Sequence, residues 1–562
     1  MAKSEAKVEE LVAMIERGEL RLPEMQRRYV WQATRVRDLL DSLYRGYPSG
    51  TILLWETDEA VPLRDFAVGQ QDNPYQSTKL LLDGQQRLTS LLAVLRGQPI
   101  NVRWRKKPIE LLFNLEHPDK LPFLTEVDDD EDNDADAGVA DADEDDLQNR
   151  LKQMTFVVFV KRLAALPNWI SVSEVFKTES DAPFLKKAGV VSLDDPRFEK
   201  YSQRLARLRG IRNYFYRMDV LERNLSYDEV TETFVRVNSL GAKLRGSDLA
   251  MAQITAKWQD SLKTFEAFQH ECAEEGFDLD LGIHVKNLVA FATGQSRFHT
   301  VGNLKPAQLQ VAWKCAKDGF HYAINFLKAN ARIESQALLS SPFMLILLGY
   351  FGHHCSYTLD AQQAAELRHW LYVANAKGRY SRGSSETLLD KDLATIREGK
   401  GVQGLVEILS QQFGRLDVQP ADLEGRNARS AYFKTMFLAF RQDGAKDWTS
   451  NFPVSLSHKG KQHRLQFHHV FPRALLKGEY KPAVVNDIAN MAFIGGKTNR
   501  RILVTPPADY LPKIDSGARA AQCIPDQDVS LAVENYPRFL LERRKLIAAR
   551  LNRFLEDARK VQ

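Results

Sequence analysis

Hydrophobic residues in the first hundred positions follow two kinds of spacing, and each kind predicts a different element. Val8, Leu11, Val12 and Ile15 recur at the spacing of a helix face, whereas residues 51–55 and 80–82 are short apolar runs typical of strands. The pattern predicts helices over residues 4–17, 34–44 and 87–95, an extended segment over residues 20–31, and strands over residues 51–55 and 80–82. Helices that alternate with short strands indicate a compact α/β or α+β unit.

The remainder of the chain is mostly helical in pattern. Residues 155–160, with the sequence TFVVFV, predict a buried strand. From residue 198 to 440 helical spacing dominates, with helices predicted over residues 227–237, 246–265 and 361–376. Residues 343–351 are the most apolar run, but they are far too short to span a bilayer and predict a buried helix. A group of His and Asn residues over 464–511 and a basic amphipathic helix over 536–560 follow.

The charges are distributed unevenly along the chain. The 562 residues carry a formal net charge of only +4, yet 13 of the 21 residues from 126 to 146 are acidic and none is basic. Without those 13, the chain has 77 basic and 60 acidic residues, an excess of 17 positive charges. This excess suits a polyanionic partner, although surface cations that keep a protein soluble explain it equally well. The acidic stretch lacks apolar residues and predicts a disordered insertion.

Cysteine spacing and the N-terminal sequence restrict the compartment. The four cysteines are far apart and form no CxxC pair, so a disulfide framework or a zinc ribbon is not expected. The first ten residues are polar and of mixed charge, unlike a signal peptide. We therefore expect reduced thiols in a cytoplasmic protein that has no membrane segment.

The C-terminal segment holds the residue types that phosphodiester hydrolysis needs. The reaction requires a base that activates water, a group that orients this base, and a divalent cation that relieves charge on the phosphate. We predict His469 as the general base and Asn490 as the residue whose side-chain carbonyl accepts the other N–H of its ring. His468 and Asn499 are the predicted ligands of a magnesium or manganese ion.

Three cationic residues lie next to this set, namely Lys497, Arg500 and Arg501. We predict that they contact DNA phosphates. Neighbours on a regular strand point to opposite faces, so His468 and His469 share a site only where the strand ends or bends, as Pro472 would favour. A His-His pair is also compatible with a structural role, in which carbonyls satisfy the imidazoles and the asparagines cap turns.

A second candidate site follows from residues 80–88, whose sequence LLLDGQQRL places a strand, a tight turn and a helix start together. Gly84 permits a close approach of the backbone to a ligand. Free N–H groups at the start of the helix attract phosphate, and Arg87 can bind a phosphate through two hydrogen bonds. Asp83 could instead be the N-cap of a plain Asp-Gly turn. The predicted nucleotide site comprises Asp83, Gly84, Gln85, Gln86 and Arg87, with Gln26, Arg27 and Arg28 lining the same pocket.

In their order, these motifs resemble the GmrSD-type restriction endonucleases. The C-terminal pattern of that family runs His-Ile-Phe-Pro, Asn-x-x-x-Asn, a further Asn and Pro-x-x-Tyr-Leu, and here it begins with residues 469–472, HVFP. His468 stands where HNH sites often have Asp. The N-terminal Asp-Gly-Gln-Gln-Arg motif and the sequence FVRVNSLGAKL at residues 234–244, which adds Asn238 to the nucleotide site, also match. Residues 378–381, GRYS, fit a weaker fourth pattern.

The resemblance implies an α+β, multidomain chain. A ParB/sulfiredoxin-like nucleotide-binding domain is expected over residues 1–125 and, after the acidic insertion at 126–150, over residues 151–260. A helical linker domain over residues 261–420 and a ββα-metal (HNH) nuclease domain over residues 421–562, closed by the basic helix, are expected to follow.

The function that the resemblance implies is that of a type IV restriction enzyme. Such a protein is an NTP-dependent, modification-sensing endonuclease that cuts double-stranded phage DNA, here with magnesium or manganese at the HNH site. The sequence leaves open whether GTP, UTP, CTP or ATP is used and whether the chain forms a homo-oligomer. Two alternatives are a nucleotide-switched ParB-like DNA-binding protein with an inactive nuclease domain and an RNA-directed or toxin-like nuclease.

Overall fold

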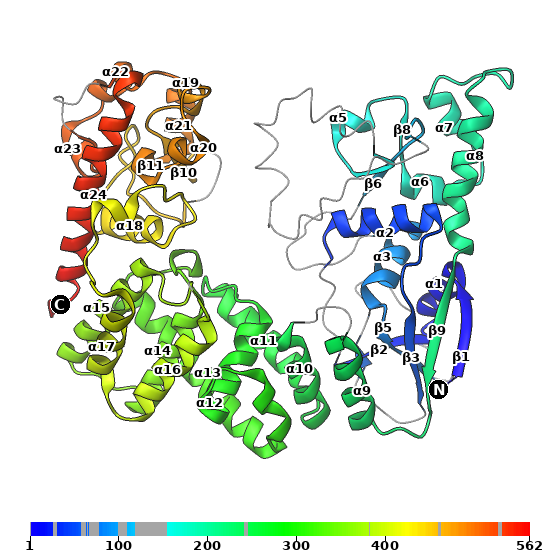
Figure 1. Ribbon diagram of the computed structural model, residues 1–562, viewed down its shortest axis with the longest axis horizontal. Coiled ribbons are helices and arrows are strands. Elements are labelled where there is room, and N and C mark those ends of the chain that lie inside the picture. The colour runs from blue at the N-terminus through cyan, green and yellow to red at the C-terminus, as the bar shows by residue number, and fades with distance from the viewer. Residues whose placement is uncertain are drawn as a thin grey trace. The chain divides into compact units, whose positions relative to one another are not determined.

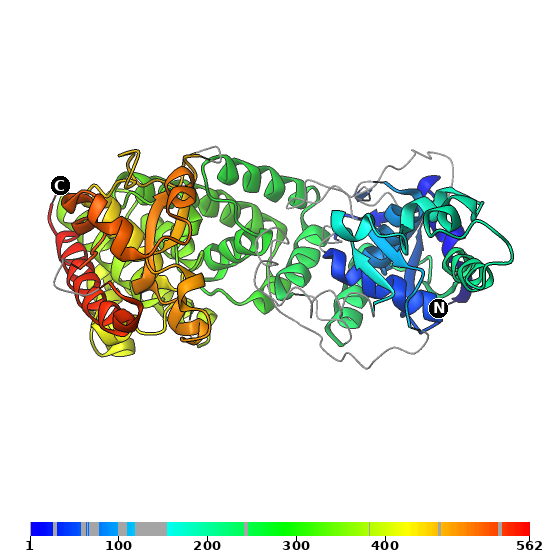
Figure 2. The ribbon, with the colours of Figure 1, turned by 90° about the horizontal axis from the view of Figure 1, so that it is seen from above.

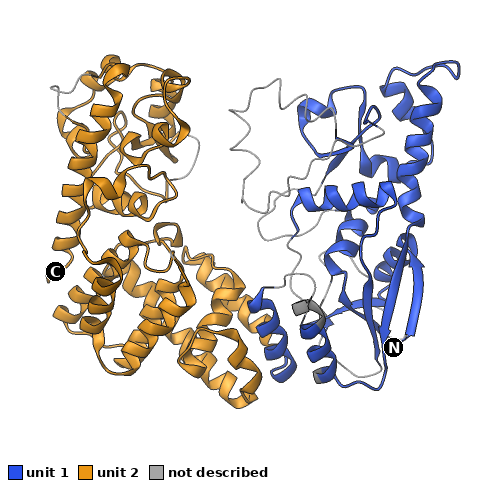
Figure 3. Cartoon of the chain, in the orientation of Figure 1, with its two compact units in different colours: residues 1–260 blue, residues 261–562 orange. Residues whose placement is uncertain are grey.

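The computed structural model describes residues 2–25, 31–57, 63–64, 66, 78–98, 110–118, 154–240, 245–381, 383–458, 462–525 and 531–561. The chain divides into two compact units, Met1–Asp260 and Ser261–Gln562 (Figure 3). Both units combine helices with strands (Figure 1), so the predicted mixed α+β, multidomain class is confirmed. In the described part of the chain, no helix has the length and apolar character needed to cross a membrane.

The first unit is built on a sheet with the strand order β1-β9-β3-β5-β2-β4. Its strands are β1 (Ala2–Lys7), β2 (Leu20–Pro23), β3 (Ile52–Thr57), β4 (Leu63–Arg64), β5 (Thr78–Asp83) and β9 (Phe215–Leu221). Strand β3 runs antiparallel to β5 and parallel to β9, while β2 and β5 are parallel. Strand β9 therefore comes from a part of the chain, residues 198–440, where the sequence pattern predicts helices.

The predicted first helix is wrong over its N-terminal part. Residues 2–7 form strand β1, which pairs with β9 in antiparallel register, and the helix α1 (Val8–Glu16) begins only at Val8. The hydrogen bonds that β1 gains from the sheet edge outweigh the weak helical preference of these polar residues. The predicted face of Val8, Leu11, Val12 and Ile15 is buried, as expected.

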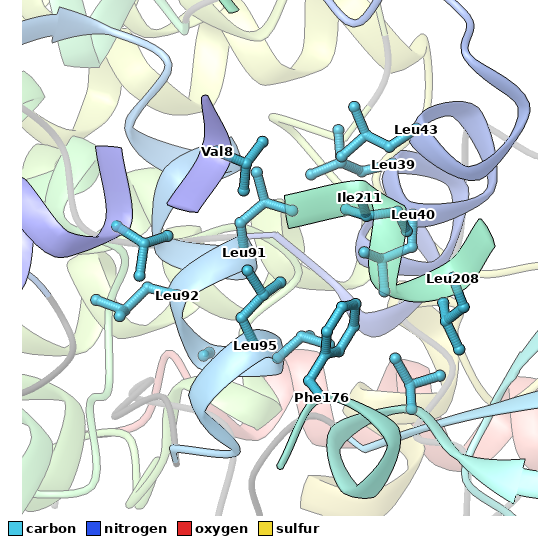
Figure 4. Packing of buried hydrophobic residues seen from close by; sticks show 14 of the residues in the cluster. Val8, Leu39, Leu40, Leu43, Leu91, Leu92, Leu95, Phe176, Leu208 and Ile211 are labelled. Carbon is cyan, nitrogen blue, oxygen red and sulfur yellow. The ribbon is translucent and has the colours of Figure 1, made fainter. Parts of the chain in front are cut away.

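Helices pack against this sheet through a leucine-rich core. The helices are α2 (Ala33–Arg45), α3 (Gln85–Arg96), α6 (Val172–Lys177) and α8 (Phe198–Arg209), followed by the 3-10 turn η1 (Gly210–Asn213). Figure 4 shows Leu91 and Leu95 of α3 pointing toward Leu40, Phe176 and Leu208. The helices predicted over residues 34–44 and 87–95 are thus confirmed, each with slightly wider bounds.

A second, three-stranded sheet has the order β7-β6-β8 and is formed by β6 (Leu111–Asn114), β7 (Phe156–Val158) and β8 (Trp169–Ser171). Strand β7 confirms the buried strand predicted over residues 155–160. The unit also contains α5 (Lys161–Ala164), α7 (Ala182–Lys187), α9 (Tyr227–Leu240) and α10 (Gly246–Lys257). The single helix predicted over residues 246–265 is wrong, because Trp258 is extended and Asp260 has a positive φ of 59°, which breaks it in two.

The second unit begins with a helical region, which Figure 2 shows from above. It comprises α11 (Ser261–Glu274), α12 (Leu281–Thr293), α13 (Pro306–Ala329), α14 (Phe343–His354), α15 (Ala361–Lys377), α16 (Ser385–Arg397) and α17 (Gly401–Phe413). Helices α13 and α14 cross closely at Gly319 and Gly349, where a Cβ on Gly349 would lie 2.7 Å from the Gly319 carbonyl oxygen. Helix α14 is the buried helix that residues 343–351 predict.

The C-terminal region contains the predicted His and Asn cluster. Its strands β10 (Leu465–His469) and β11 (Met491–Gly495) pair in antiparallel register, with His468 opposite Ala492. Helix α21 (Gly496–Ile502) follows β11 directly, and the short helices α19 (Arg473–Leu476) and α20 (Pro482–Val485) lie in the connection between the two paired strands. The region also contains α18 (Ala431–Gln442), α22 (Pro507–Tyr510), α23 (Ser516–Ala520) and α24 (Tyr536–Asp557).

Candidate functional site

The pairing of β10 with β11, which leads directly into α21, brings His468 and Asn499 together. The Nδ1 atom of His468 lies 2.8 Å from the Oδ1 atom of Asn499. The imidazole is buried, and it packs edge-on against the rings of Trp448 and Tyr510. Burial lowers the pKa of His468 to about 4, so this imidazole is neutral at physiological pH.

Both ring nitrogens of His468 face an acceptor. The Tyr510 hydroxyl donates its hydrogen to the Val470 carbonyl at 2.8 Å, so toward His468 its oxygen can only accept. It lies 3.4 Å from Nε2 of His468. A neutral ring has one proton for these two contacts: on Nδ1 it is donated to the Asn499 oxygen, and on Nε2 it is donated to Tyr510 and leaves the Nδ1 lone pair for a cation.

Asp447 anchors the N-terminus of α21 and thereby positions Asn499. Its carboxylate accepts hydrogen bonds from the Gly495 N–H at 2.6 Å and from the Thr498 hydroxyl at 2.7 Å. Burial would raise the pKa of Asp447, but bonds donated by Gly495, Ser450 and Thr498 outweigh it and lower the pKa. An ionised carboxylate at a helix N-terminus is stabilised by the free N–H groups there. The sequence analysis did not identify Asp447.

His469 is the last residue of β10, and its ring contacts a different asparagine from the predicted one. The Nε2 atom of His469 lies 3.0 Å from the Oδ1 atom of Asn486, which follows α20. If Asn486 accepts at this contact, the proton of the neutral ring is on Nε2 and the lone pair is on Nδ1. The strand does end at His469, as the sequence requires if the two histidines share one site.

The prediction that Asn490 orients the ring of His469 is wrong. Both ends of the Asn490 amide are bound by backbone: Oδ1 accepts from the Phe471 N–H at 2.8 Å, while Nδ2 donates to the carbonyls of Phe471 and Val485. The side chain is fully buried. Asn490 therefore fixes the turn after β10 to the segment before β11. Asn486, and not Asn490, is the asparagine that contacts the ring of His469.

The three predicted phosphate contacts share one surface of α21. Lys497, Arg500 and Arg501 are exposed and are spaced so that they lie on one face of the helix. Asn499, on the same helix, is half-buried and turns toward His468. The helix thus presents cations to solvent beside the contact between His468 and Asn499.

His468 and Asn499 supply two donor atoms that could bind a divalent cation. Among the described residues, no group of three or more His, Cys, Asp or Glu side chains is placed to hold a metal ion. The His468 nitrogen and the Asn499 oxygen are nevertheless 2.8 Å apart, close to the roughly 3 Å that separates adjacent ligands of an octahedral ion with bonds of about 2.1 Å. These two atoms fit a magnesium or manganese ion that keeps several water ligands.

The N-terminal candidate site is centred on the start of α3. Gly84 precedes the helix with a φ of +100°, and no side chain caps the helix N-terminus. A Cβ on Gly84 would lie 2.4 Å from Cδ1 of Ile52, so only glycine fits this turn. Asp83 is therefore not an N-cap; instead it pairs with Arg87 at 3.0 Å.

The protein itself binds the guanidinium group of Arg87. It donates to the Ser49 carbonyl, to the Thr51 carbonyl at 2.6 Å and to Asp83, and it lies over the ring of Tyr216. The predicted role of Arg87 in gripping a phosphate therefore requires that it leave some of these partners. Its contacts fix the turn at residues 47–50 to the start of α3.

The structure describes some of the other predicted nucleotide-binding residues. Gln85 and Gln86 are buried, and Oε1 of Gln86 accepts a hydrogen bond from the Trp31 N–H at 3.2 Å. This contact brings the end of the segment 26–31 to the start of α3. Gln26, Arg27, Arg28 and the side chain of Asn238 lie outside the described residues.

The weaker motif at residues 378–381 is part of a buried ion pair. The Arg379 guanidinium donates to both carboxylate oxygens of Asp392, at 2.7 and 3.0 Å, and the Tyr380 hydroxyl donates to Asp392 at 2.7 Å. Only 1% of each charged side chain is exposed. These residues join α15 to α16 and have a structural role.

Two comparisons with known proteins bear on the family of this chain. Across 542 residues the chain is 21% identical to "Uncharacterized protein MJ0686" of Methanocaldococcus jannaschii. The alignment covers 90% of this chain and 86% of the relative. Residues 8–255 match the model of the family described as GmrSD restriction endonuclease, N-terminal domain. The match supports a GmrSD-family restriction enzyme N-terminal domain in this chain.

Proposed function

We propose that the chain is a metal-dependent DNA endonuclease of the HNH type, whose C-terminal site is controlled by the N-terminal domain. The observation that carries the proposal is the contact of His468 with Asn499, in which a neutral imidazole nitrogen and an amide oxygen converge at 2.8 Å. The restriction-endonuclease family matched by residues 8–255 supports DNA as the substrate.

His468 and Asn499 would hold the cation. His468 suits this role because its neutral ring offers a lone pair and because Tyr510 can accept the proton on the other nitrogen. When bound, magnesium or manganese polarises the scissile phosphate and stabilises the leaving oxygen. Lys497, Arg500 and Arg501 would hold the flanking phosphates.

His469 would act as the general base. With its Nε2 proton donated to Asn486, Nδ1 is the nitrogen that takes a proton from the attacking water. Asn486 is then a positioning residue, since it fixes the tautomer and the orientation of the ring. Asn490 contributes only by holding the turn that follows His469.

The N-terminal domain would bind and hydrolyse a nucleoside triphosphate, sense DNA modification and gate cleavage. The uncapped start of α3 supports phosphate binding, because its N–H groups are not occupied by a capping side chain. Arg87 would exchange its carbonyl partners for phosphate oxygens. Asp83, released from Arg87, would then be available to a nucleotide-bound cation or water.

The test of the nuclease site is cleavage of modified phage DNA by the full chain with Mg²⁺, Mn²⁺ or EDTA, with all four triphosphates present in every arm. We expect cutting only with a cation, its loss in His469→Ala, and unchanged cutting in the control His270→Ala, an exposed histidine in the same unit. Mn²⁺ binding measured by electron paramagnetic resonance should be lost in His468→Ala and Asn499→Ala. Cation-dependent cutting by His469→Ala at the wild-type rate would exclude His469 as the base.

The test of gating compares modified and unmodified DNA, each with and without each of the four nucleotides. We expect cutting only when modified DNA and one of the triphosphates are both present, and reduced nucleotide binding in Arg87→Gln. Equal rates in all arms would exclude gating. DNA binding without cutting under any condition would instead support the ParB-like alternative, and preference for RNA in a competition assay would support the RNA-directed one.

A further inference from the structure

The helix that carries Asn499 ends in a tight turn of unusual composition. The Thr505 N–H donates to the Ile502 carbonyl at 2.9 Å, so residues 502–505 form a hydrogen-bonded turn. Leu503 occupies its first central position with φ of 47° and ψ of −113°. These angles match the first central residue of a type II′ turn, a position that glycine dominates because a Cβ is strained there.

The side chains of this turn are exposed although they are apolar. Leu503 is 66% exposed and Val504 is 60% exposed. A leucine at this position therefore combines backbone strain with an unburied hydrophobic side chain, and neither feature stabilises the fold. Strain of this kind, at an exposed position beside a candidate site, points to a role in ligand contact.

The surroundings of the turn indicate what it contacts. Arg500 and Arg501 precede it on the exposed face of α21. The Leu503 N–H donates to the Asn499 carbonyl at 3.0 Å, so the turn lies one helical turn, or about 6 Å along the axis, from the side chain that meets His468. An apolar tip flanked by cations suits a ligand with an anionic backbone and an apolar interior, which is the chemistry of duplex DNA.

We propose that Leu503 and Val504 form an apolar wedge that enters a DNA groove and loosens the stacking of the base step beside the scissile phosphate. The inference rests on the proposed nuclease function, because it places DNA at His468 and Asn499. Arg500 and Arg501 hold the phosphates that flank the step, while the leucine side chain packs against base faces. Unstacking makes the backbone easier to bend toward the cation site.

The test uses Leu503→Gly, which removes the wedge and relieves the strained backbone. In the full chain on a His469→Ala background, binding can be measured without cutting. The DNA is a duplex that carries the modification required for cutting by the wild-type protein. It has 2-aminopurine beside the mapped cut site. We expect about tenfold weaker binding, loss of the fluorescence increase that reports unstacking, and a raised midpoint of thermal unfolding. A fold defect would lower that midpoint.

Two controls separate the wedge from general charge and from general hydrophobicity. Arg501→Ala should lower the slope of log affinity against log salt concentration by about one, whereas Leu503→Gly should leave the slope unchanged. Leu541→Ser on α24, a leucine that is also half exposed, should leave DNA binding unchanged, whereas Leu503→Ser should weaken it.

Three outcomes would overturn the inference, and they are distinguishable. If the wild-type chain cuts DNA and Leu503→Gly binds and unstacks it equally well, the wedge is excluded while the nuclease function stands. If Leu503→Gly alters the sedimentation coefficient of the free protein, the apolar turn is an interface between copies of the chain. If the wild-type chain neither binds nor cuts DNA, both proposals fail.

Discussion

His468 and Asn499, which are 31 residues apart in the chain, meet with a separation of 2.8 Å between the imidazole Nδ1 and the amide Oδ1. Strand pairing places His468 opposite Ala492, and α21 begins only four residues later, so the helix returns Asn499 over the strand. The contact is between two atoms that can each donate a lone pair to a cation. It is the contact on which the proposed cation site depends.

The two asparagines near His469 should respond differently to substitution. Asn486→Ala removes the group that fixes the ring, and we expect a loss of about 10- to 100-fold in kcat with unchanged unfolding. Asn490→Ala leaves three buried backbone groups without their partner and should destabilise the chain by about 3 kcal/mol. Steady-state cleavage and urea unfolding of both variants check this prediction. Equal effects of the two variants on kcat and on stability would contradict it.

Acid should destabilise the wild-type chain through His468. Burial lowers its pKa from 6.5 to about 4, so between these values the unfolded chain binds a proton that the folded chain does not. Stability therefore falls as the pH falls from 6.5 to 4, by about 3 kcal/mol from this group. The measurement is urea unfolding across this range for the wild type and for His468→Gln. The difference between the two proteins isolates His468 from the carboxylates, and parallel curves would exclude the effect.

The ion pair between Arg379 and Asp392 should be sensitive to the loss of one partner. Arg379→Ala leaves a carboxylate buried without its cation, so we expect a loss of about 3–5 kcal/mol in the free energy of unfolding. Arg379→Met combined with Asp392→Leu should recover most of it, because no buried charge remains. Lys400→Ala, which breaks an exposed pair with Glu398, is the control and should have no measurable effect. A stable Arg379→Ala would show that the pair is not buried in solution.

Gly84→Ala should destabilise the start of α3 more than an ordinary substitution at a glycine with positive φ. The backbone strain costs about 1 kcal/mol, and the new Cβ would also meet Ile52 at 2.4 Å. Gly46→Ala is the matched control, because Gly46 has a φ of +77° but nothing within 4 Å of its Cβ position. Chemical unfolding of the two variants measures the difference, and equal losses would mean that Ile52 moves aside without cost.

The parts of the fold that were predicted correctly are those with strong local periodicity. The helices α2, α3, α14, α15 and α24 follow directly from apolar spacing. Strands β1 and β9 could not be predicted, because they form through pairing with remote strands: β1 with β9, and β9 also with β3. The hydrogen bonds between β1 and β9 join residues more than two hundred positions apart, which no local pattern records.

The candidate site was predicted by residue type more successfully than by contact. The spacing of the motif indicated that an amide would orient His469. Asn486 and Asn490 follow His469 by 17 and 21 residues, and only the chain path after α20 decides between them. Asp447 belongs to no motif, and the Pro-x-x-Tyr-Leu pattern that includes Tyr510 assigns no role to its side chain. The two residues act through the start of α21 and through the ring of His468, and only the tertiary structure reveals such partners.

Part of the positive charge in the C-terminal region also has an internal use. Arg543 of α24 is fully buried, and its guanidinium donates to the carbonyls of Ala489, Met491 and Gln522. Burial lowers its pKa to about 10, so it remains charged at neutral pH. The neighbouring Arg544 pairs with the buried Asp487 at 2.6 Å. These cations bind the protein rather than a polyanion, which the sequence count could not distinguish.

The attachment of α24 limits how the C-terminal unit can be shortened. A fragment that ends soon after Tyr510 would keep every proposed catalytic side chain. It would also expose the carbonyls of Ala489 and Met491 and leave the carboxylate of Asp487 without its arginine. Expression of a minimal nuclease fragment, or fusion of a reporter within the last helix, would therefore disturb the turn beside His469 from a distance. Tags and truncations are better placed beyond residue 560, because the Arg368 guanidinium donates to the carbonyls of Ala558 and Lys560.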